Sequence, residues 1–363
     1  MSHQVVTRRP EPRADVAVMA GYHSPQLEVA VRLNTNESPV PPPAAWREQV
    51  ADELAGIAWH RYPDRGAAAL RAGLARHHGV EPEQVFAANG SNEVLQALGL
   101  AYGGPGRSAA VFEPTYALHA HIARLTGTDV VVGERSDDFG LDLAEVDRVI
   151  ARHGPALTFL CSPNNPTGLI EPEEVVLAVR DRAPGLLVVD EAYGQFAPWT
   201  ALDLLDEDDP LVVTRTYSKT WASAGLRLGY CVAPSWVVEQ LDKVTLPYHL
   251  DAFKQVAGRL ALEHEAEMRA RVAALVEERG RVLSGLGRLP VDVWPSAANF
   301  VLFRTRHRPA NEVWAALVER SILVRNCSSW PRLEGCLRVT IGTSDENGAF
   351  LAALAEILEE PEP

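Results

Sequence analysis

The feature that most constrains the fold is a series of short apolar runs separated by segments long enough to form helices. Six such runs span residues 108–114, 129–134, 156–162, 185–193, 211–218 and 227–233. Their apolar character is unbroken rather than alternating, which is typical of strands that are buried on both faces. Because these runs alternate with helix-length segments, the sequence predicts a mainly parallel sheet covered by helices, an α/β fold.

Further local patterns extend this prediction. The alanine-rich segment 66–79 predicts a helix closed by Gly79, and 85–102 predicts a strand, a glycine turn and a helix with Ser91 or Asn92 as cap. Residues 252–286 predict one long amphipathic helix. Shorter strands at 299–305, 322–328 and 336–343 and a closing helix at 347–360 then predict a second, smaller α+β domain.

These elements predict three parts of the chain. Residues 1–50 form an N-terminal arm with part of the small domain, residues 51–250 form the large domain, and residues 251–363 form a linking helix and the rest of the small domain. The length of 363 residues suits one large and one smaller domain.

Composition excludes several classes of protein. The formal charge of −14, with scattered lysines and arginines, argues against a nucleic-acid binder. No apolar run approaches the length of a membrane span, and the N-terminus lacks the apolar core of a signal peptide, so a cytoplasmic protein is expected. The four cysteines form no CxxC pair and are expected to be free thiols. The histidine pairs 77–78 and 119–121 lack further ligands, so no metal site is predicted.

Polar motifs follow four of the predicted strands, where ligands of a doubly wound sheet bind. The stretch NGSNE, 89–93, opens a helix whose free N–H groups favour a phosphate, and SPNNPTG, 162–168, is a rigid loop that presents amides. Asp190 and Tyr193 follow the next run, and Lys219 ends another, with Arg227 eight residues further. Each motif alone has an ordinary explanation as a cap, a turn or a surface lysine, but their joint order indicates one functional site.

With these motifs the chain resembles the aspartate-aminotransferase-like enzymes of fold type I, which use pyridoxal 5′-phosphate (PLP). The resemblance runs from VRLNTNESP, 31–39, to CLRVTIGT, 336–343. Within that group the chain is most similar to histidinol-phosphate aminotransferases, through the stretches GYHSPQ, LNTNESP, RYPD, ANGSNE, EPTY and DENGAF. The resemblance implies a PLP-dependent aminotransferase with small-molecule amine and keto-acid substrates.

The resemblance also implies roles for residues around the cofactor ring. Lys219 would hold the cofactor as a Schiff base and carry the proton between the substrate Cα and the cofactor. Asp190 would keep the pyridine nitrogen protonated. Asn165 and Tyr193 would bind the phenolic oxygen of the ring, and Tyr116 would lie against the ring face.

A second implied set binds the cofactor phosphate. It consists of Arg227, Ser218 and Thr216 together with the backbone at Gly90, Ser91 and Asn92. Tyr62, in RYPD, would reach the phosphate of the neighbouring subunit's cofactor, which implies a homodimer with shared active sites.

A third implied set recognises the substrates. Arg338 would bind the carboxylate of the glutamate co-substrate, and Arg325 and Tyr22 would hold the phosphate end of histidinol phosphate. Asn36 and Glu37 lie in the N-terminal loop that would cover the pocket.

Some residues depart from the pattern of the resembled subgroup. The segment 326–336 is long and carries Trp330, Trp221 lies two residues after Lys219, and Asp251 and Lys254 replace smaller polar residues. An extra indole in the pocket would favour an aromatic substrate. The preferred reaction pairs histidinol phosphate with 2-oxoglutarate in histidine biosynthesis. The alternatives are an aromatic or specialised amino-acid aminotransferase and a decarboxylase of the threonine-phosphate type. A regulatory module is disfavoured because no DNA-binding segment fits before residue 20.

Overall fold

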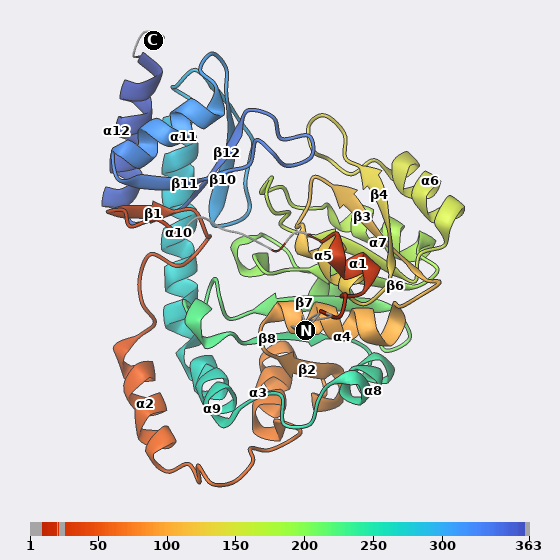
Figure 1. Cartoon of the computed structure of the whole chain (residues 1–363). Coiled ribbons are helices and arrows are strands. Elements are labelled where there is room, and N and C mark those ends of the chain that lie inside the picture. Colours follow the sequence, from red (N-terminus) through yellow and green to blue (C-terminus); the bar gives the residue numbers. More distant parts are fainter. Residues whose placement is uncertain (1–8, 20, 22–25, 360–363) are drawn as a thin grey trace, which may run out of the picture.

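The computed structural model of the chain, drawn in Figure 1, describes residues 9–19, 21 and 26–359. Its larger sheet has seven strands in the order β2-β8-β7-β6-β5-β3-β4. All neighbours pair in parallel except β8, which is antiparallel to both β2 and β7. The strands are β2 (Val85–Ala88), β3 (Ser108–Glu113), β4 (Asp129–Glu134), β5 (Leu157–Cys161), β6 (Leu186–Asp190), β7 (Leu211–Thr216) and β8 (Gly229–Val232).

Helices cover both faces of this sheet. They are α3 (Ala68–His78), α4 (Ser91–Tyr102), α5 (Leu118–Leu125), α6 (Leu143–His153), α7 (Glu173–Arg182) and α8 (Ser235–Val244). Alternate residues of β6 point to opposite faces. Val188 packs in one apolar cluster with α4, α5 and α8, and Val189 packs in another with α6 and α7. Every residue of β5, β6 and β7 is buried, which explains their unbroken apolar runs and confirms the predicted sheet.

The smaller sheet has five strands in the order β1-β11-β12-β10-β9. Its strands are β1 (Val31–Leu33), β9 (Val291–Val293), β10 (Phe300–Thr305), β11 (Ile322–Asn326) and β12 (Cys336–Thr340). Helices α10 (Glu265–Leu286), α11 (Ala310–Glu319) and α12 (Ser344–Glu359) pack on it around Phe300, Phe303 and Phe350. The N-terminal strand β1 pairs in parallel with β11, so the N-terminal arm supplies an edge strand. The predicted fold class, PLP fold type I with a smaller α+β unit, is confirmed.

The prediction of one helix over 252–286 is wrong. The segment forms α9 (Ala252–Ala261), a 3₁₀ turn (Leu262–His264) and α10. Ala257 and Leu260 of α9 bury against α2 (Ala44–Ala55) and α3, whereas Val282 of α10 packs under the small sheet. Because α9 and the later part of α10, from Leu275 on, bury their apolar sides in different clusters, the chain turns between the two helices, with His264 at φ −107°, ψ 30°. Figure 1 shows α10 running from α9 to the small sheet.

The predicted domain limits, 1–50, 51–250 and 251–363, remain a prediction. The short helix α1 (Ala14–Ala17) precedes β1, and 3₁₀ turns lie at Pro82–Gln84, Gly194–Phe196, Ala201–Leu204 and Ala224–Leu226. All four cysteines are buried and free, as predicted. None of the helices in the described ranges has both the length and the apolar surface needed to cross a membrane.

Gly229 determines how closely β8 approaches the turn between β2 and α4. A Cβ atom at this position would lie 2.2 Å from the backbone nitrogen of Ser91 and 2.5 Å from the carbonyl carbon of Gly90. Both of these atoms are backbone, so no side chain can move aside to make room. Gly229 therefore fixes the place of the turn at the start of α4.

We expect Gly229→Ala to lower the free energy of unfolding by at least about 2 kcal/mol, because the added methyl group forces the backbone apart. Urea unfolding followed by circular dichroism measures this change. The matched control is Gly280→Ala in α10, where a Cβ meets nothing within 4 Å. That change should leave stability equal or raise it by roughly up to 1 kcal/mol. Equal stability of the two variants would contradict the role of Gly229.

Candidate active site

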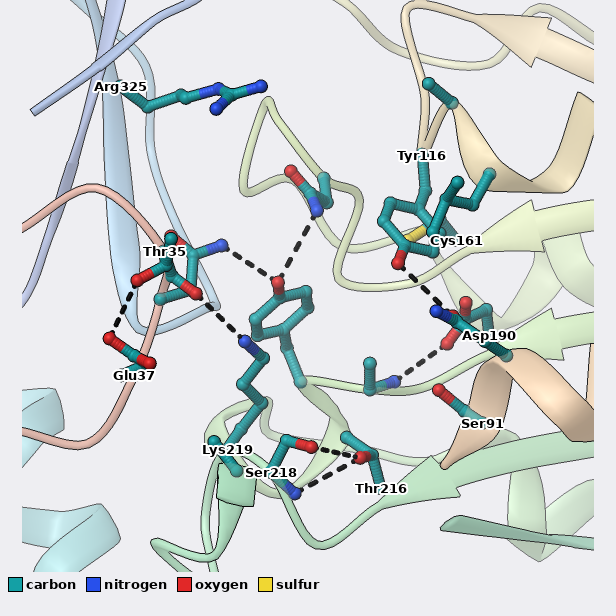
Figure 2. Close-up of a pocket in the computed structure, with 18 of the residues that line it drawn as sticks. Thr35, Glu37, Ser91, Tyr116, Cys161, Asp190, Thr216, Ser218, Lys219 and Arg325 are labelled. Atoms are coloured by element: carbon teal, nitrogen blue, oxygen red, sulfur yellow. Dashed lines mark hydrogen bonds between the residues drawn. The ribbon is translucent and has the colours of Figure 1, made fainter. Parts of the chain in front are cut away.

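A cavity of about 420 Å³ lies where the carboxyl ends of β5, β6 and β7 face the small sheet. The larger sheet contributes the end residues Cys161, Asp190 and Thr216, and the N-terminal segment 34–37 borders the cavity from the other side. Figure 2 shows Lys219 directed toward Thr35, with Arg325 reaching in from the small sheet. A parallel sheet gathers its strand ends at one edge, so the four sequence motifs meet here as expected.

Asp190, the last residue of β6, is almost completely buried and held by three donors. Its Oδ2 accepts a hydrogen bond from Nε2 of His119 at 2.9 Å. Its Oδ1 accepts hydrogen bonds from Oγ1 of Thr214 at 3.2 Å and from the backbone N–H of Ala192 at 3.1 Å. These contacts fix the carboxylate at the cavity wall, so a ligand with a cationic N–H group can pair with it.

Sequence reasoning missed the contribution of His119, which it treated only as an ordinary histidine. The side chain is fully buried, its ring stacks on Phe159 at 5.0 Å between centroids, and it meets the ring of Tyr116 edge-on at 5.3 Å. Among the described residues, Nδ1 of His119 has no hydrogen-bond partner, which favours the tautomer with the proton on Nε2. The only sequence signal is its spacing, three residues after Tyr116, and that spacing does not reveal a contact with β6.

Lys219 lies three residues beyond β7, and its side chain is half-buried in the cavity. Its Nζ donates a hydrogen bond to the carbonyl oxygen of Thr35 at 3.1 Å. Burial lowers the pKa of this amine from 10.5 to about 7, and the positive charges of Arg338 and Arg227 act in the same direction. The amine is therefore partly neutral near neutral pH, the state in which it is a nucleophile and a base.

A hydrogen-bonded group joins the two sheets across the cavity. The hydroxyl oxygen of Tyr193 accepts hydrogen bonds from Nδ2 of Asn36 at 2.8 Å and from Nδ2 of Asn165 at 3.4 Å. Oδ1 of Asn165 in turn accepts a hydrogen bond from Nη1 of Arg338 at 2.5 Å. Burial raises the pKa of Tyr193, so its hydroxyl stays protonated and can also donate to a ligand oxygen.

The base of the cavity gathers donors for an anion. Oγ1 of Thr216 donates to Oγ of Ser218 at 3.0 Å, and Nη1 of Arg227 donates to the same Oγ at 3.3 Å. Helix α4 begins beside them at Ser91, after Gly90, with no side-chain cap on its free N–H groups. Gly90 has φ +82°, and a Cβ there would lie 2.8 Å from Nη2 of Arg227. This glycine lets the guanidinium lie against the helix start, which makes an anion site.

The small sheet brings two arginines to the other end of the cavity. Arg325 of β11 and Arg338 of β12 are directly opposite in the strand register, and both line the cavity. Nη2 of Arg338 also donates to the carbonyl oxygen of Asn34 at 3.0 Å. Cζ of Arg325 lies over the ring of Trp330, 5.2 Å from its centroid. This end of the cavity therefore suits the anionic part of a substrate.

Glu37 supplies the negative charge on the N-terminal side. Its Oε2 accepts hydrogen bonds from Oγ1 of Thr35 at 2.8 Å and from Nη2 of Arg32 at 3.0 Å. Burial raises the pKa of Glu37, but the hydrogen bonds from Thr35 and Arg32 outweigh it and leave the pKa below its ordinary value. The carboxylate is thus ionised at neutral pH and partly balances the cations of the cavity.

Most of the residues singled out in the sequence are brought together. Those that line the cavity are Asn36, Glu37, Ser91, Asn92, Tyr116, Asn165, Asp190, Tyr193, Thr216, Ser218, Lys219, Arg227, Arg325 and Arg338. Gly90 adjoins Arg227 at its base. Tyr62 is outside it, 79% exposed and stacked on Tyr248 at 4.5 Å between ring centroids. Tyr22 lies outside the described residues.

The unusual side chains noted in the sequence separate into two groups. Trp330 lines the cavity. Trp221 does not, because its indole is buried against Tyr217 in the core, with ring centroids 5.5 Å apart. Asp251 caps the start of α9 by accepting from the backbone N–H of Lys254 at 2.8 Å, and the two side chains form an ion pair there. Of these four residues, only Trp330 can touch a ligand in this cavity.

The donors fit the cofactor predicted from the sequence. PLP carries a phosphate, a ring nitrogen, a phenolic oxygen and an aldehyde, and each has a matching partner among the cavity groups. The anion site suits the phosphate, the buried Asp190 suits the ring nitrogen, Tyr193 and Asn165 suit the oxygen, and the amine of Lys219 suits the aldehyde. Gly90 lets the guanidinium of Arg227 approach the start of α4, where both can contact one phosphate group.

Comparison with known proteins decides the family. The model for "Aminotransferase class I and II" matches residues 28–354. The chain belongs to that family. A histidinol-phosphate aminotransferase of Frankia casuarinae is 48% identical over 94% of this chain and 88% of its own length. Another from Streptomyces avermitilis is 46% identical over 93% of this chain and 94% of its own. The family resemblance predicted from the sequence is thereby confirmed.

A solved structure of the same family has the same fold. The histidinol-phosphate aminotransferase of Sinorhizobium meliloti, crystallised in complex with pyridoxal-5′-phosphate, superimposes with a TM-score of 0.87 at 24% identity. The match covers 97% of this chain and 98% of that one. At this identity the likeness concerns the fold, and the two sheets of this aminotransferase chain agree with it.

We expect the amine of Lys219 in the cofactor-free protein to react with acetic anhydride with a pH midpoint near 7, because only the neutral amine attacks and its pKa is about 7. The rate should fall below that pH, where the amine is protonated, and level off above it. Competitive labelling followed by peptide mapping gives the midpoint. Arg338→Gln removes a positive charge and should raise the midpoint, whereas Arg304→Gln, outside the cavity, should not. A midpoint at the ordinary value of 10.5 in the unaltered chain would contradict a lowered pKa for Lys219.

Proposed function

We propose that this chain is a histidinol-phosphate aminotransferase that uses PLP. It exchanges the amino group between histidinol phosphate and imidazole-acetol phosphate, with glutamate and 2-oxoglutarate as the second couple, a step of histidine biosynthesis. The 48% identity to a histidinol-phosphate aminotransferase over 94% of the chain supports this substrate. The single structural observation that carries it is the pair Arg325 and Arg338 at one end of the cavity.

The cofactor is held by groups that the fold places around it. When bound, PLP supplies an electron sink for the charge left when a proton leaves the substrate Cα. Arg227, Thr216, Ser218 and the start of α4 bind the phosphate. Asp190 would pair with the ring nitrogen and keep it protonated. His119 holds the Asp190 carboxylate in place at 2.9 Å.

Three further side chains orient the ring. Tyr193 would donate a hydrogen bond from its hydroxyl to the phenolic oxygen, since its raised pKa keeps the hydroxyl protonated. Asn165 contributes its amide to the same region while accepting from Arg338. Tyr116, fixed by its edge contact with His119 and by a hydrogen bond of 3.3 Å from its hydroxyl to Oδ1 of Asn92, covers one face of the ring.

Lys219 binds the cofactor and then moves the proton. Its lowered pKa of about 7 makes the free amine a base at neutral pH, so it would accept the proton from the substrate Cα and carry it to the cofactor. The carbonyl of Thr35, which accepts from Nζ at 3.1 Å, keeps the side chain directed into the cavity. The proton thus stays on one amine throughout the transfer.

The substrate lies between the cofactor and the small sheet. Arg338 binds the α-carboxylate of glutamate, and Arg325 binds the phosphate of histidinol phosphate. Tyr22 is part of the same phosphate site in this proposal, and Asn36 and Glu37 cover the bound substrate. The two arginines give an anionic substrate two alternative places to bind, which a transfer between a phosphate ester and a dicarboxylate requires.

A second candidate function is an aminotransferase for aromatic amino acids. The observation that favours it is Trp330, whose indole forms part of the cavity wall. A decarboxylase of the threonine-phosphate type has the same cofactor chemistry and differs in the bond that breaks. The products of single amines separate these three reactions.

We expect histidinol phosphate and glutamate, each added alone to the holoenzyme, to convert the absorbance of the bound cofactor to that of its amine form. Phenylalanine should do so with a kcat/KM lower by at least about 100-fold, because it has no group for Arg325. No carbon dioxide should be released from threonine phosphate. Conversion by phenylalanine but not by histidinol phosphate would favour the aromatic function, and release of carbon dioxide would favour the lyase.

The proposal includes a homodimer with shared active sites. Tyr62 and Tyr248 stack on one another at the surface. Trp59 and Leu246, in the same two loops, and Phe253, in the first turn of α9, are also exposed apolar residues. Nε2 of Gln255 in α9 donates to the carbonyl oxygen of Asp64 at 2.8 Å and so joins α9 to the loop of Tyr62. An exposed apolar surface of this kind supports contact with a second copy, which would place Tyr62 at the partner's cofactor phosphate.

Hybrid dimers test this arrangement. Lys219→Ala and Tyr62→Ala chains are each expected to have little activity as homodimers. If Tyr62 acts in the partner's site, unfolding and refolding an equal mixture should restore about a quarter of the wild-type activity, because half of the dimers then contain one intact site. Steady-state turnover of the mixture gives this value. A mixture no more active than its components would contradict a shared site.

A further inference from the structure

The loop between β11 and β12 brings an indole to the end of the cavity that holds the two arginines. It spans residues 327–335 and carries Trp330, which lines the cavity beside Arg325. Cζ of Arg325 lies over this indole, 5.2 Å from the ring centroid. A guanidinium over an aromatic ring at this distance makes a cation–π contact.

The loop is anchored at both ends of its path. Leu333, Cys327 and Cys336 are buried in a small apolar cluster with Phe139 and Leu302. Because Phe139 follows β4 and Leu302 belongs to β10, this cluster contains side chains from both parts of the molecule. The indole of Trp330 packs against the same cluster, so its position is fixed by packing rather than by the loop backbone alone.

An arginine of the loop adds polar contacts to the larger sheet. Nη1 of Arg332 donates to the carbonyl oxygen of Arg135, and Nη2 donates to Oδ1 of Asp137 at 3.1 Å. Residues 135 and 137 follow β4, so these bonds cross from the small sheet to the segment beyond the large one. Together with the apolar cluster, these hydrogen bonds fix the position of Trp330 relative to both sheets.

Both cavity arginines have supporting contacts. Arg338 is held by hydrogen bonds to Asn165 and to the carbonyl oxygen of Asn34. Arg325 has its Cζ over the indole ring of Trp330. A cation–π contact attracts the guanidinium through its charge, so it does not need the N–H donors that bind a phosphate. This support suits an arginine that must bind a phosphate.

We propose that Trp330 is a positioning residue that orients Arg325 toward the phosphate end of the amine substrate. It thereby sets the preference of the enzyme for a phosphorylated donor over the same donor without its phosphate. This inference rests on the function proposed above. On this basis the indole, which would otherwise suggest an aromatic substrate, serves the binding of a phosphate ester.

Two substitutions distinguish the effect of the aromatic ring of Trp330 from the effect of its volume. Trp330→Phe keeps an aromatic face beside Arg325, whereas Trp330→Leu keeps apolar volume without a π face. The matched control is Trp294→Leu. Trp294 packs in the same cluster and forms the same kind of contact with Arg304, also at 5.2 Å, but neither residue lines the cavity.

In the holoenzyme, we expect Trp330→Leu to lower kcat/KM for histidinol phosphate about three- to tenfold, mainly through KM, because a cation–π contact is lost. Trp330→Phe should keep most of the wild-type kcat/KM for histidinol phosphate. With histidinol, which lacks the phosphate, each variant should stay within about twofold of the wild type. Trp294→Leu should leave both substrates unchanged. In an Arg325→Ala background, Trp330→Leu should have no further effect, since the two residues act together.

An equal loss of kcat/KM for histidinol and histidinol phosphate would overturn the proposal, as would additive effects of the Arg325 and Trp330 substitutions. Trp330 would then only form part of the cavity wall. Failure of the wild type to use histidinol phosphate would instead reject the proposed function. In that case the pairing is tested with inorganic phosphate as an inhibitor of the glutamate half-reaction. If phosphate inhibits Trp330→Leu and Arg325→Ala more weakly than the wild type, but inhibits Trp294→Leu equally, the result supports the pairing of Trp330 with Arg325. If phosphate inhibits Trp330→Leu as strongly as the wild type, the result rejects this pairing.

Discussion

The hydrogen bond from Arg338 to Asn165 is the contact on which the organisation of the site depends. Arg338 belongs to the small sheet and Asn165 to the loop after β5, so this bond crosses the cavity. Asn165 then contacts Tyr193, which also accepts from Asn36 of the N-terminal segment. Three parts of the chain that are far apart in sequence meet through these few polar groups.

These contacts between distant parts of the chain also affect the pKa of Lys219. The segment that contains Asn36 also provides the carbonyl of Thr35, which accepts from Nζ of Lys219, and Glu37, which is ionised beside it. Burial beneath this segment removes the amine from water, and the guanidinium of Arg338 adds a positive charge. The pKa of Lys219 therefore falls to about 7. In the proposed function, the arginine that binds a substrate carboxylate thus also keeps the lysine reactive.

The loop 327–335 makes a second connection between the small sheet and the larger part of the molecule. Its Arg332 binds the backbone of Arg135, and its Trp330 lies against Arg325. The cavity is therefore bordered by one polar connection through Arg338 and by a second that combines packing and hydrogen bonds. The end of the cavity beside Arg325 is thus shaped by residues outside the sequence motifs of the cofactor site.

Local sequence was sufficient to predict the strands of the larger sheet and to place polar residues at their ends, most of which line one cavity. Unbroken apolar runs can only be buried on both faces, and the polar residues that end them, such as Asp190 and Lys219, must then meet at one edge of the sheet. Three features could not be predicted this way: the contact of His119 with Asp190, the turn at 262–264 and the burial of Trp221 in the core. Each depends on which side chains face each other after folding. The sequence by itself determined where the strands of the larger sheet lie along the chain and which polar residues end them, because burial and turn formation act locally. Only the tertiary structure decided which distant residues touch, because those contacts follow from how the two sheets pack.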